Sequence, residues 1–92
     1  MAKKKKINVE QLQLMASAIT DHRGGDVARF LEDLAVMAGS KVAISGGKDG
    51  KSRHFKFAGI EGAPSRLGGR AGDWEALDNW ANAARRAVVQ EA

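Results

Sequence analysis

The 92-residue chain contains no cysteine and no long apolar run, and both absences exclude whole classes of protein. Without cysteine there is no disulfide framework and no thiolate metal site. No stretch approaches the roughly 20 apolar residues of a membrane span. The segment after the starting lysines is too polar for a secretory signal. The sequence therefore predicts a single domain in a reducing cytoplasm, without a membrane partner.

Residue types with catalytic or metal-binding chemistry are present, but not in the arrangements that such chemistry needs. His22 and His54 lack the spacing of metal ligands. Serines and carboxylates occur without a pattern that would place a nucleophile beside a base. We therefore expect no catalytic residue, no metal and no cofactor, and we interpret the chain as a non-enzymatic protein.

The segment ISGGKDGKSRHF, residues 44–55, resembles a phosphate-binding loop because it contains Gly-Lys-Ser after further glycines. In nucleotide hydrolases a first glycine stands five residues before the second, and this chain has Ser45 there. That loop must also open a helix, whereas the following SRHFKF alternates as a strand does. The sequence predicts a hairpin tip here and no nucleotide site.

Apolar residues with a period of 3.6 predict two helices in the N-terminal half of the chain. Asn8 is a suitable N-cap for the first helix, which ends at the glycines after Arg23. Asp26 is expected to cap the second helix, and Gly39 is expected to end it.

The pattern then changes to a period of two, which predicts an antiparallel hairpin. If residues 49–50 form a two-residue turn, Ile44 lies opposite Phe55 and Val42 opposite Phe57. All four apolar side chains then share one face, and a slip of one residue would separate them. A lone hairpin has open strand edges that a second copy could extend, so we also expect a homodimer.

Residues 59–72 hold five glycines and the single proline, and they are predicted to form a loop with a short strand near Leu67. Asp73 is expected to cap a C-terminal amphipathic helix that buries both tryptophans. The predicted order is α-α-β-β-α, an α+β fold with two N-terminal helices, a hairpin and a glycine-rich loop before the last helix. It comprises one domain over residues 7–92 after a basic disordered tail at 1–6.

Positive charge is concentrated in the middle of the chain. Residues 41–72 hold seven basic and two acidic residues, whereas the chain outside this segment and the lysine tail holds nine acidic and four basic ones. This uneven distribution of charge indicates what the protein could bind, and it says nothing about the fold. The candidate nucleic-acid-binding residues are Lys48, Lys51, Arg53, Lys56, Arg66 and Arg70.

Three interpretations of this charge remain open. In the first, the basic tail, the hairpin and the glycine-rich loop bind nucleic acid non-specifically. In the second, the protein is an interaction or assembly module whose basic middle meets an acidic protein or the acidic helices of another copy. In the third, the lysines only keep a small protein soluble. We place nucleic-acid binding first and protein interaction second.

The organisation of the chain resembles that of small bacteriophage or prophage proteins of unassigned function. The likeness lies in the lysine-rich start, the glycine-rich middle and the closing DWEALDNWANAARRAV. The resemblance implies a bacterial cytoplasm and an accessory role, and it assigns no functional residue.

Overall fold

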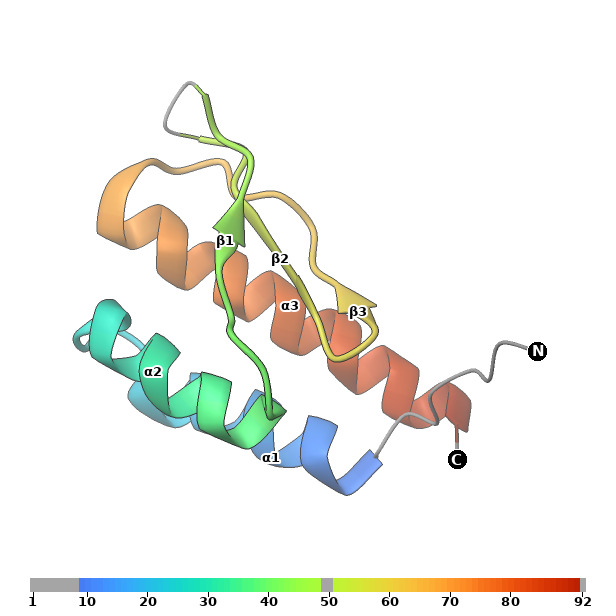
Figure 1. Ribbon diagram of the computed structural model, residues 1–92. Coiled ribbons are helices and arrows are strands. Elements are labelled where there is room, and N and C mark those ends of the chain that lie inside the picture. Colours follow the sequence, from blue (N-terminus) through green and yellow to red (C-terminus); the bar gives the residue numbers. More distant parts are fainter. Residues whose placement is uncertain (1–8, 49–50, 92) are drawn as a thin grey trace.

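The computed structural model describes residues 9–48 and 51–91, which form an α+β fold of three helices and a three-stranded antiparallel sheet (Figure 1). The predicted α+β class is confirmed, and the strand that follows the hairpin lies elsewhere than the one expected near Leu67. The elements are α1 (Val9–His22), α2 (Val27–Ala38), β1 (Ile44–Ser45), β2 (His54–Phe57), β3 (Ile60–Glu61) and α3 (Gly69–Glu91).

The ends of α2 follow the predicted capping residues. The Asp26 carboxylate accepts hydrogen bonds from the backbone N–H groups of Ala28 and Arg29, at 3.1 and 3.4 Å. Gly39 ends the helix with a left-handed φ of 71°, which glycine adopts without steric cost. Asn8, the expected cap of α1, lies outside the described residues.

The predicted register of the first hairpin is confirmed, because Ile44 lies opposite Phe55. The predicted turn at residues 49–50 lies outside the described part of the chain. Val42 precedes β1, so the predicted pairing with Phe57 is not part of the ladder, yet both side chains are buried. The apolar face of the hairpin therefore points into the core as the alternation indicates.

The third strand lies inside the segment that was expected to be a loop. β3 pairs with β2 so that Ile60 lies opposite Phe57. Ala58 and Gly59 between the strands both have positive φ, 54° and 78°, as a type I′ turn requires. The strand predicted near Leu67 was wrong. Because β3 covers one of the two edges of the hairpin, it removes part of the reason for expecting a homodimer, which stays a prediction.

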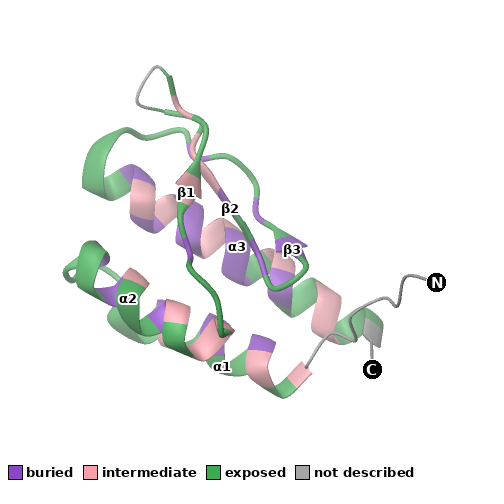
Figure 2. Cartoon of the chain, in the orientation of Figure 1, coloured by how far each residue is buried: buried purple, intermediate pink, exposed green. Residues whose placement is uncertain are grey.

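The core is built around α3, which contacts both the sheet and α1, while α2 packs on α1 (Figure 1). Trp80 is fully buried, and its ring stacks on Phe57 with centroids 4.2 Å apart and planes 5° apart. Its Nε1 donates to the carbonyl of Ile60 at 3.1 Å. Buried residues face this common interior from every element except β1 (Figure 2). The expectation that both tryptophans are core residues is confirmed.

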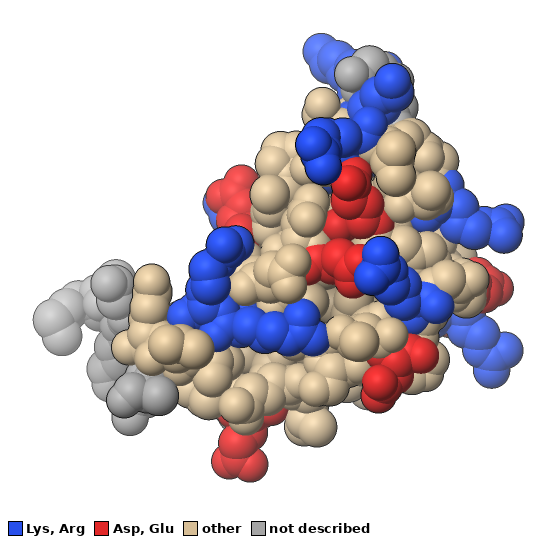
Figure 3. Space-filling model, turned by 180° about the vertical axis from the view of Figure 1, so that it is seen from behind, with Lys and Arg blue, Asp and Glu red and all other residues tan. Residues whose placement is uncertain are grey.

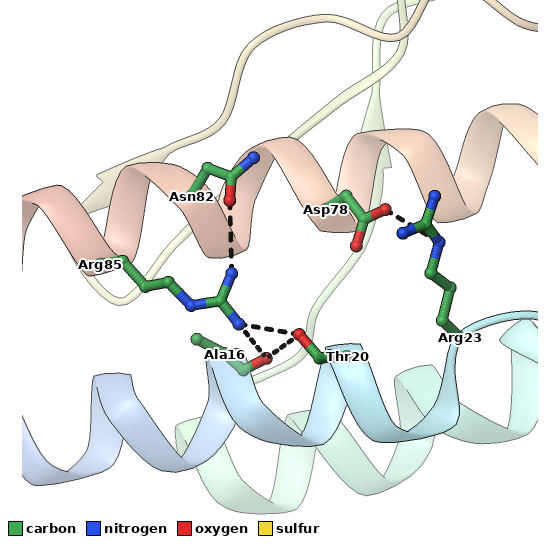
Figure 4. A network of polar contacts seen from close by, with 6 residues as sticks. All are labelled: Ala16, Thr20, Arg23, Asp78, Asn82 and Arg85. Carbon is green, nitrogen blue, oxygen red and sulfur yellow. Dashed lines mark hydrogen bonds and ion pairs between the residues drawn. The ribbon is translucent and has the colours of Figure 1, made fainter.

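Two arginines connect α3 with α1 and with the residue that follows α1 (Figure 4). Arg85 donates to the Thr20 hydroxyl at 2.7 Å and to the Ala16 carbonyl at 3.3 Å. Arg23 lies 3.1 Å from the carboxylate of Asp78. Both arginine side chains therefore make contacts within the fold.

The last helix begins at Gly69, earlier than the Asp73 cap that the sequence predicted. The backbone at Leu67, before the helix, lies close to Gly72 in its first turns. A Cβ atom on Gly72 would lie 2.1 Å from the Leu67 carbonyl oxygen. The Glu75 carboxylate also accepts the backbone N–H of Leu67 at 3.2 Å. Contacts made across the turn thus extend the helix into the glycine-rich segment.

Candidate nucleic-acid interface

Arg53 joins the stem of the first hairpin to the first turns of α3. Its Nη1 lies 3.1 Å from Asp73 Oδ1, and its Nη2 donates to the Gly69 carbonyl at 2.8 Å. The two side chains are only 21% and 20% exposed. Although Arg53 was a candidate phosphate contact, its charge is engaged within the fold, where it positions the hairpin.

A second connection runs through the backbone. The N–H of Ser52 donates to the carbonyl of Ser65 at 2.9 Å, and the N–H of Ser65 donates to the carbonyl of Arg53 at 2.7 Å. Ser65 is buried, with 2% of its surface exposed. The segment after β3 therefore continues alongside the entry into β2, and its following residue, Arg66, comes next to the hairpin.

These connections bring basic residues from three separate segments to one end of the molecule. Lys51 precedes the bonded residue Ser52, Arg66 follows Ser65, and Arg70 follows Gly69. We call this surface the basic end and define it by four residues: Lys48, Lys51, Arg66 and Arg70.

All four side chains of the basic end are exposed. Figure 3 shows Lys and Arg side chains gathered around the upper end of the molecule, with acidic side chains below them. Within residues 9–48 and 51–91, no ion pair involves Lys48, Arg66 or Arg70. Their positive charge is therefore presented outward.

The limbs of the hairpin approach each other closely beside Lys48. Gly46 and Gly47 have positive φ values of 80° and 81°. A Cβ atom on Gly47 would lie 2.3 Å from Arg53 Cγ and 2.7 Å from the Lys51 carbonyl oxygen. Glycine is therefore required here by the backbone path and by space, which explains why the basic segment is also rich in glycine.

Among the residues that the structure describes, two acidic side chains near the basic end are bound to groups of the fold. Asp73 is paired with Arg53. The Glu75 carboxylate accepts the backbone N–H groups of Arg66 and Leu67. The first turn of α3 contains no acidic residue, so the positive end of its dipole adds to the same field.

Lys56 is the candidate residue that lies apart from this surface. It is exposed and stands opposite Glu61 on the neighbouring strand. The same carboxylate lies 3.6 Å from Nε2 of His54, a contact that is an ion pair only when the imidazole is protonated. Lys56 therefore belongs to the open face of the sheet, where positive and negative groups offset each other.

Two positioning residues were missed by sequence reasoning. Asp73 was interpreted as a helix cap, and Ser65 was placed in a loop without a role. Their contacts with Arg53 join residues far apart in the chain, and no local pattern signals such a contact.

No family model, curated protein or solved structure matches this chain. Among the described residues, His, Asp and Glu side chains form no group of three or more that could hold a metal ion. None of the helices in this part of the chain has the length and apolar character needed to cross a bilayer.

Proposed function

We propose that this protein binds nucleic acid, without sequence preference, through its basic end. The observation that carries the proposal is the convergence of Lys48 and Lys51 with Arg66 and Arg70 on one exposed surface. Lysine and arginine side chains are the principal partners of phosphate oxygens in protein complexes with DNA. The protein would act without enzymatic activity, as a cytoplasmic accessory protein of the kind that the resemblance to phage proteins implies.

An anionic ligand explains why the charges lie together. Like charges that share a surface repel each other, and folding gains nothing evident from placing them there. A phosphate backbone would offset the repulsion, and its binding would release condensed counterions. We expect a dissociation constant of about 10⁻⁴–10⁻⁶ M at physiological salt, which is typical of non-specific binding.

We infer the lack of sequence preference from contacts that are made to phosphates, although Arg66 and Arg70 belong to the residue type that also reads guanine. Asparagine and glutamine, which read adenine by paired hydrogen bonds, are absent from residues 41–72. We propose that the basic side chains, which come from three segments, contact phosphates and not base edges. Contacts of this kind fix position on the backbone but carry no sequence information.

The alternative is a module for protein interaction, in which the basic end meets an acidic protein. Four large apolar side chains are exposed and could add to such a contact: Leu14 by 65%, Val36 by 81%, Leu67 by 50% and Val89 by 75%. Leu67 directly follows Arg66 of the basic end, and the other three each lie on a different helix. The same basic residues would serve both functions. We therefore use polyglutamate, an acidic polypeptide, as a competitor of bound DNA to distinguish the two functions.

The test compares two triple variants of equal net charge by fluorescence anisotropy with labelled DNA. One replaces Lys48, Arg66 and Arg70 with Gln, and the other replaces three exposed basic residues elsewhere, Arg29, Lys41 and Arg86. Both are made with the intact tail and with Lys3–Lys6 changed to Gln.

We expect the basic-end variant to lose most of the affinity, and its slope of log K against log salt to fall by about 2–3. The control should stay close to the parent. Equal losses in both variants, or binding that vanishes only with the tail lysines, would contradict the proposal. Displacement by polyglutamate at the same charge concentration as DNA would favour the interaction module.

A further inference from the structure

We infer that the ligand of the basic end is a double helix, held by its phosphates, and that single strands bind more weakly. This inference rests on the proposed function and adds the class of ligand. Its basis is the position of the aromatic residues, which proteins use to stack on the bases of single strands.

Every phenylalanine and tryptophan side chain of the chain is inside the core. The sequence contains three phenylalanines, two tryptophans and no tyrosine. None of the five is more than 8% exposed. They are Phe30, Phe55, Phe57, Trp74 and Trp80. The surface therefore offers no phenyl or indole face on which an unpaired base could stack.

These rings are also fixed by contacts that a bound strand would have to break. Trp80 lies against Phe57 and donates to the carbonyl of Ile60. Trp74 packs on Phe30 with centroids 5.4 Å apart, and its Nε1 donates to the carbonyl of Gly25 at 3.1 Å. Turning either tryptophan outward would open the core, so the folded protein cannot present an indole ring to an unpaired base by a local change.

What the basic end offers is a set of exposed cations on backbone segments that are joined to one another. Arg53 ties the hairpin to α3 through Asp73 and Gly69, and the bond from Ser52 to Ser65 fixes the segment that carries Arg66. Cations carried by joined backbone segments suit an anion whose charges are also closely spaced and fixed. The double helix is stiff and carries one charge per roughly 1.7 Å of axis. A flexible single strand would lose conformational freedom on the same surface without gaining stacking.

Counterion release gives the size of the expected preference. Each phosphate contact contributes a salt slope of about 0.9 on duplex DNA and about 0.7 on a single strand. If duplex and single strand bind equally at 1 M salt, contacts by the four basic-end residues make this difference about tenfold in affinity near 50 mM salt. Duplex RNA presents the same backbone chemistry, and it should bind within a few-fold of duplex DNA because no base edge is read.

The experiment titrates the full chain with a labelled DNA duplex, each of its separated strands and an RNA duplex of the same length at low salt. We expect both duplexes to bind about tenfold more tightly than the strands. Tryptophan fluorescence should not be quenched by the strands. The variant with Lys48, Arg66 and Arg70 changed to Gln should weaken binding to both duplexes.

The outcomes separate the inference from the function on which it rests. Strands that bind as tightly as the duplex, or that quench tryptophan, would overturn the preference for a double helix and leave nucleic-acid binding in place. A strong preference for one duplex type would refute phosphate recognition alone. If none of the four ligands binds, both the inference and the proposed function are wrong.

Discussion

The guanidinium of Arg53 and the carboxylate of Asp73 meet at 3.1 Å and join the first hairpin to α3. Asp73 Oδ1 accepts no hydrogen bond among the described residues, so the contact is an attraction of two charges at short range. The pair is largely shielded from water, and it decides where Lys51 and Arg70 stand relative to each other. The basic end therefore depends on a residue that does not itself present charge to a ligand.

We expect Arg53→Gln and Asp73→Asn each to lower the free energy of unfolding by about 1–3 kcal/mol, because each leaves the partner charge partly buried and unpaired. The double variant should lose less than the sum of the two, with a coupling energy of about 1 kcal/mol. Chemical denaturation of the three variants measures both quantities. Arg29→Gln, at an exposed position, serves as control. A coupling energy near zero would mean that the pair does not hold the hairpin.

Phe57→Ala should lower the free energy of unfolding by about 3–5 kcal/mol, because the ring is buried and stacked on Trp80. Val36→Ala, which also truncates an apolar side chain, should change it by less than about 0.5 kcal/mol because Val36 is exposed. Thermal or chemical unfolding compares them. Similar losses in both would show that the sheet does not pack on α3 as described.

Gly62→Ala should destabilise the fold by about 1–3 kcal/mol. A Cβ atom there would lie 2.7 Å from both the N and Cα atoms of Trp80, and a helix backbone cannot move aside as a side chain can. Gly25→Ala is the matched control, since its Cβ would meet only the His22 carbonyl oxygen at 3.2 Å. Chemical denaturation measures the free energy of unfolding of both variants. A larger loss in Gly25→Ala than in Gly62→Ala would contradict the close contact between Gly62 and the backbone of α3.

Ala58→Asn should raise the free energy of unfolding by about 0.5–1 kcal/mol. Ala58 holds a φ of 54° in the turn before β3, where its Cβ is unfavourable. Asparagine tolerates this conformation, and Asn-Gly is the preferred pair in a type I′ turn. Comparison of unfolding midpoints checks the change. A loss of stability would argue against the turn that creates the third strand.

Local patterns were sufficient for the elements whose ends and faces depend on neighbours in sequence. Asp26 and Gly39 cap the two ends of α2 as expected. The alternation around Ile44 and Phe55 predicted the register of the first hairpin. β3 escaped detection because Ala58-Gly59 lacks the asparagine or aspartate typical of its turn. This turn is supported by Trp80, whose Nε1 donates to the carbonyl of Ile60. Such tertiary support leaves no trace in the local sequence.

The candidate site was predicted in composition but not in arrangement. Six cations were named from their concentration in residues 41–72, and the structure places four at the basic end. Arg53 proved to be engaged with Asp73, and Lys56 stands opposite Glu61. Charge counts do not distinguish an exposed cation from a paired one, because the pairing depends on how the hairpin packs against α3.

The most direct test of the central claim is to follow backbone amide resonances while duplex DNA is added at low salt. We expect the shifts to gather in residues 46–48, 51–53 and 65–72, and to be small throughout α2. Raising the salt should return them toward the values of the unbound protein. Shifts confined to the lysine tail, or gathered on α1 and α2, would contradict the assignment of nucleic-acid binding to the basic end.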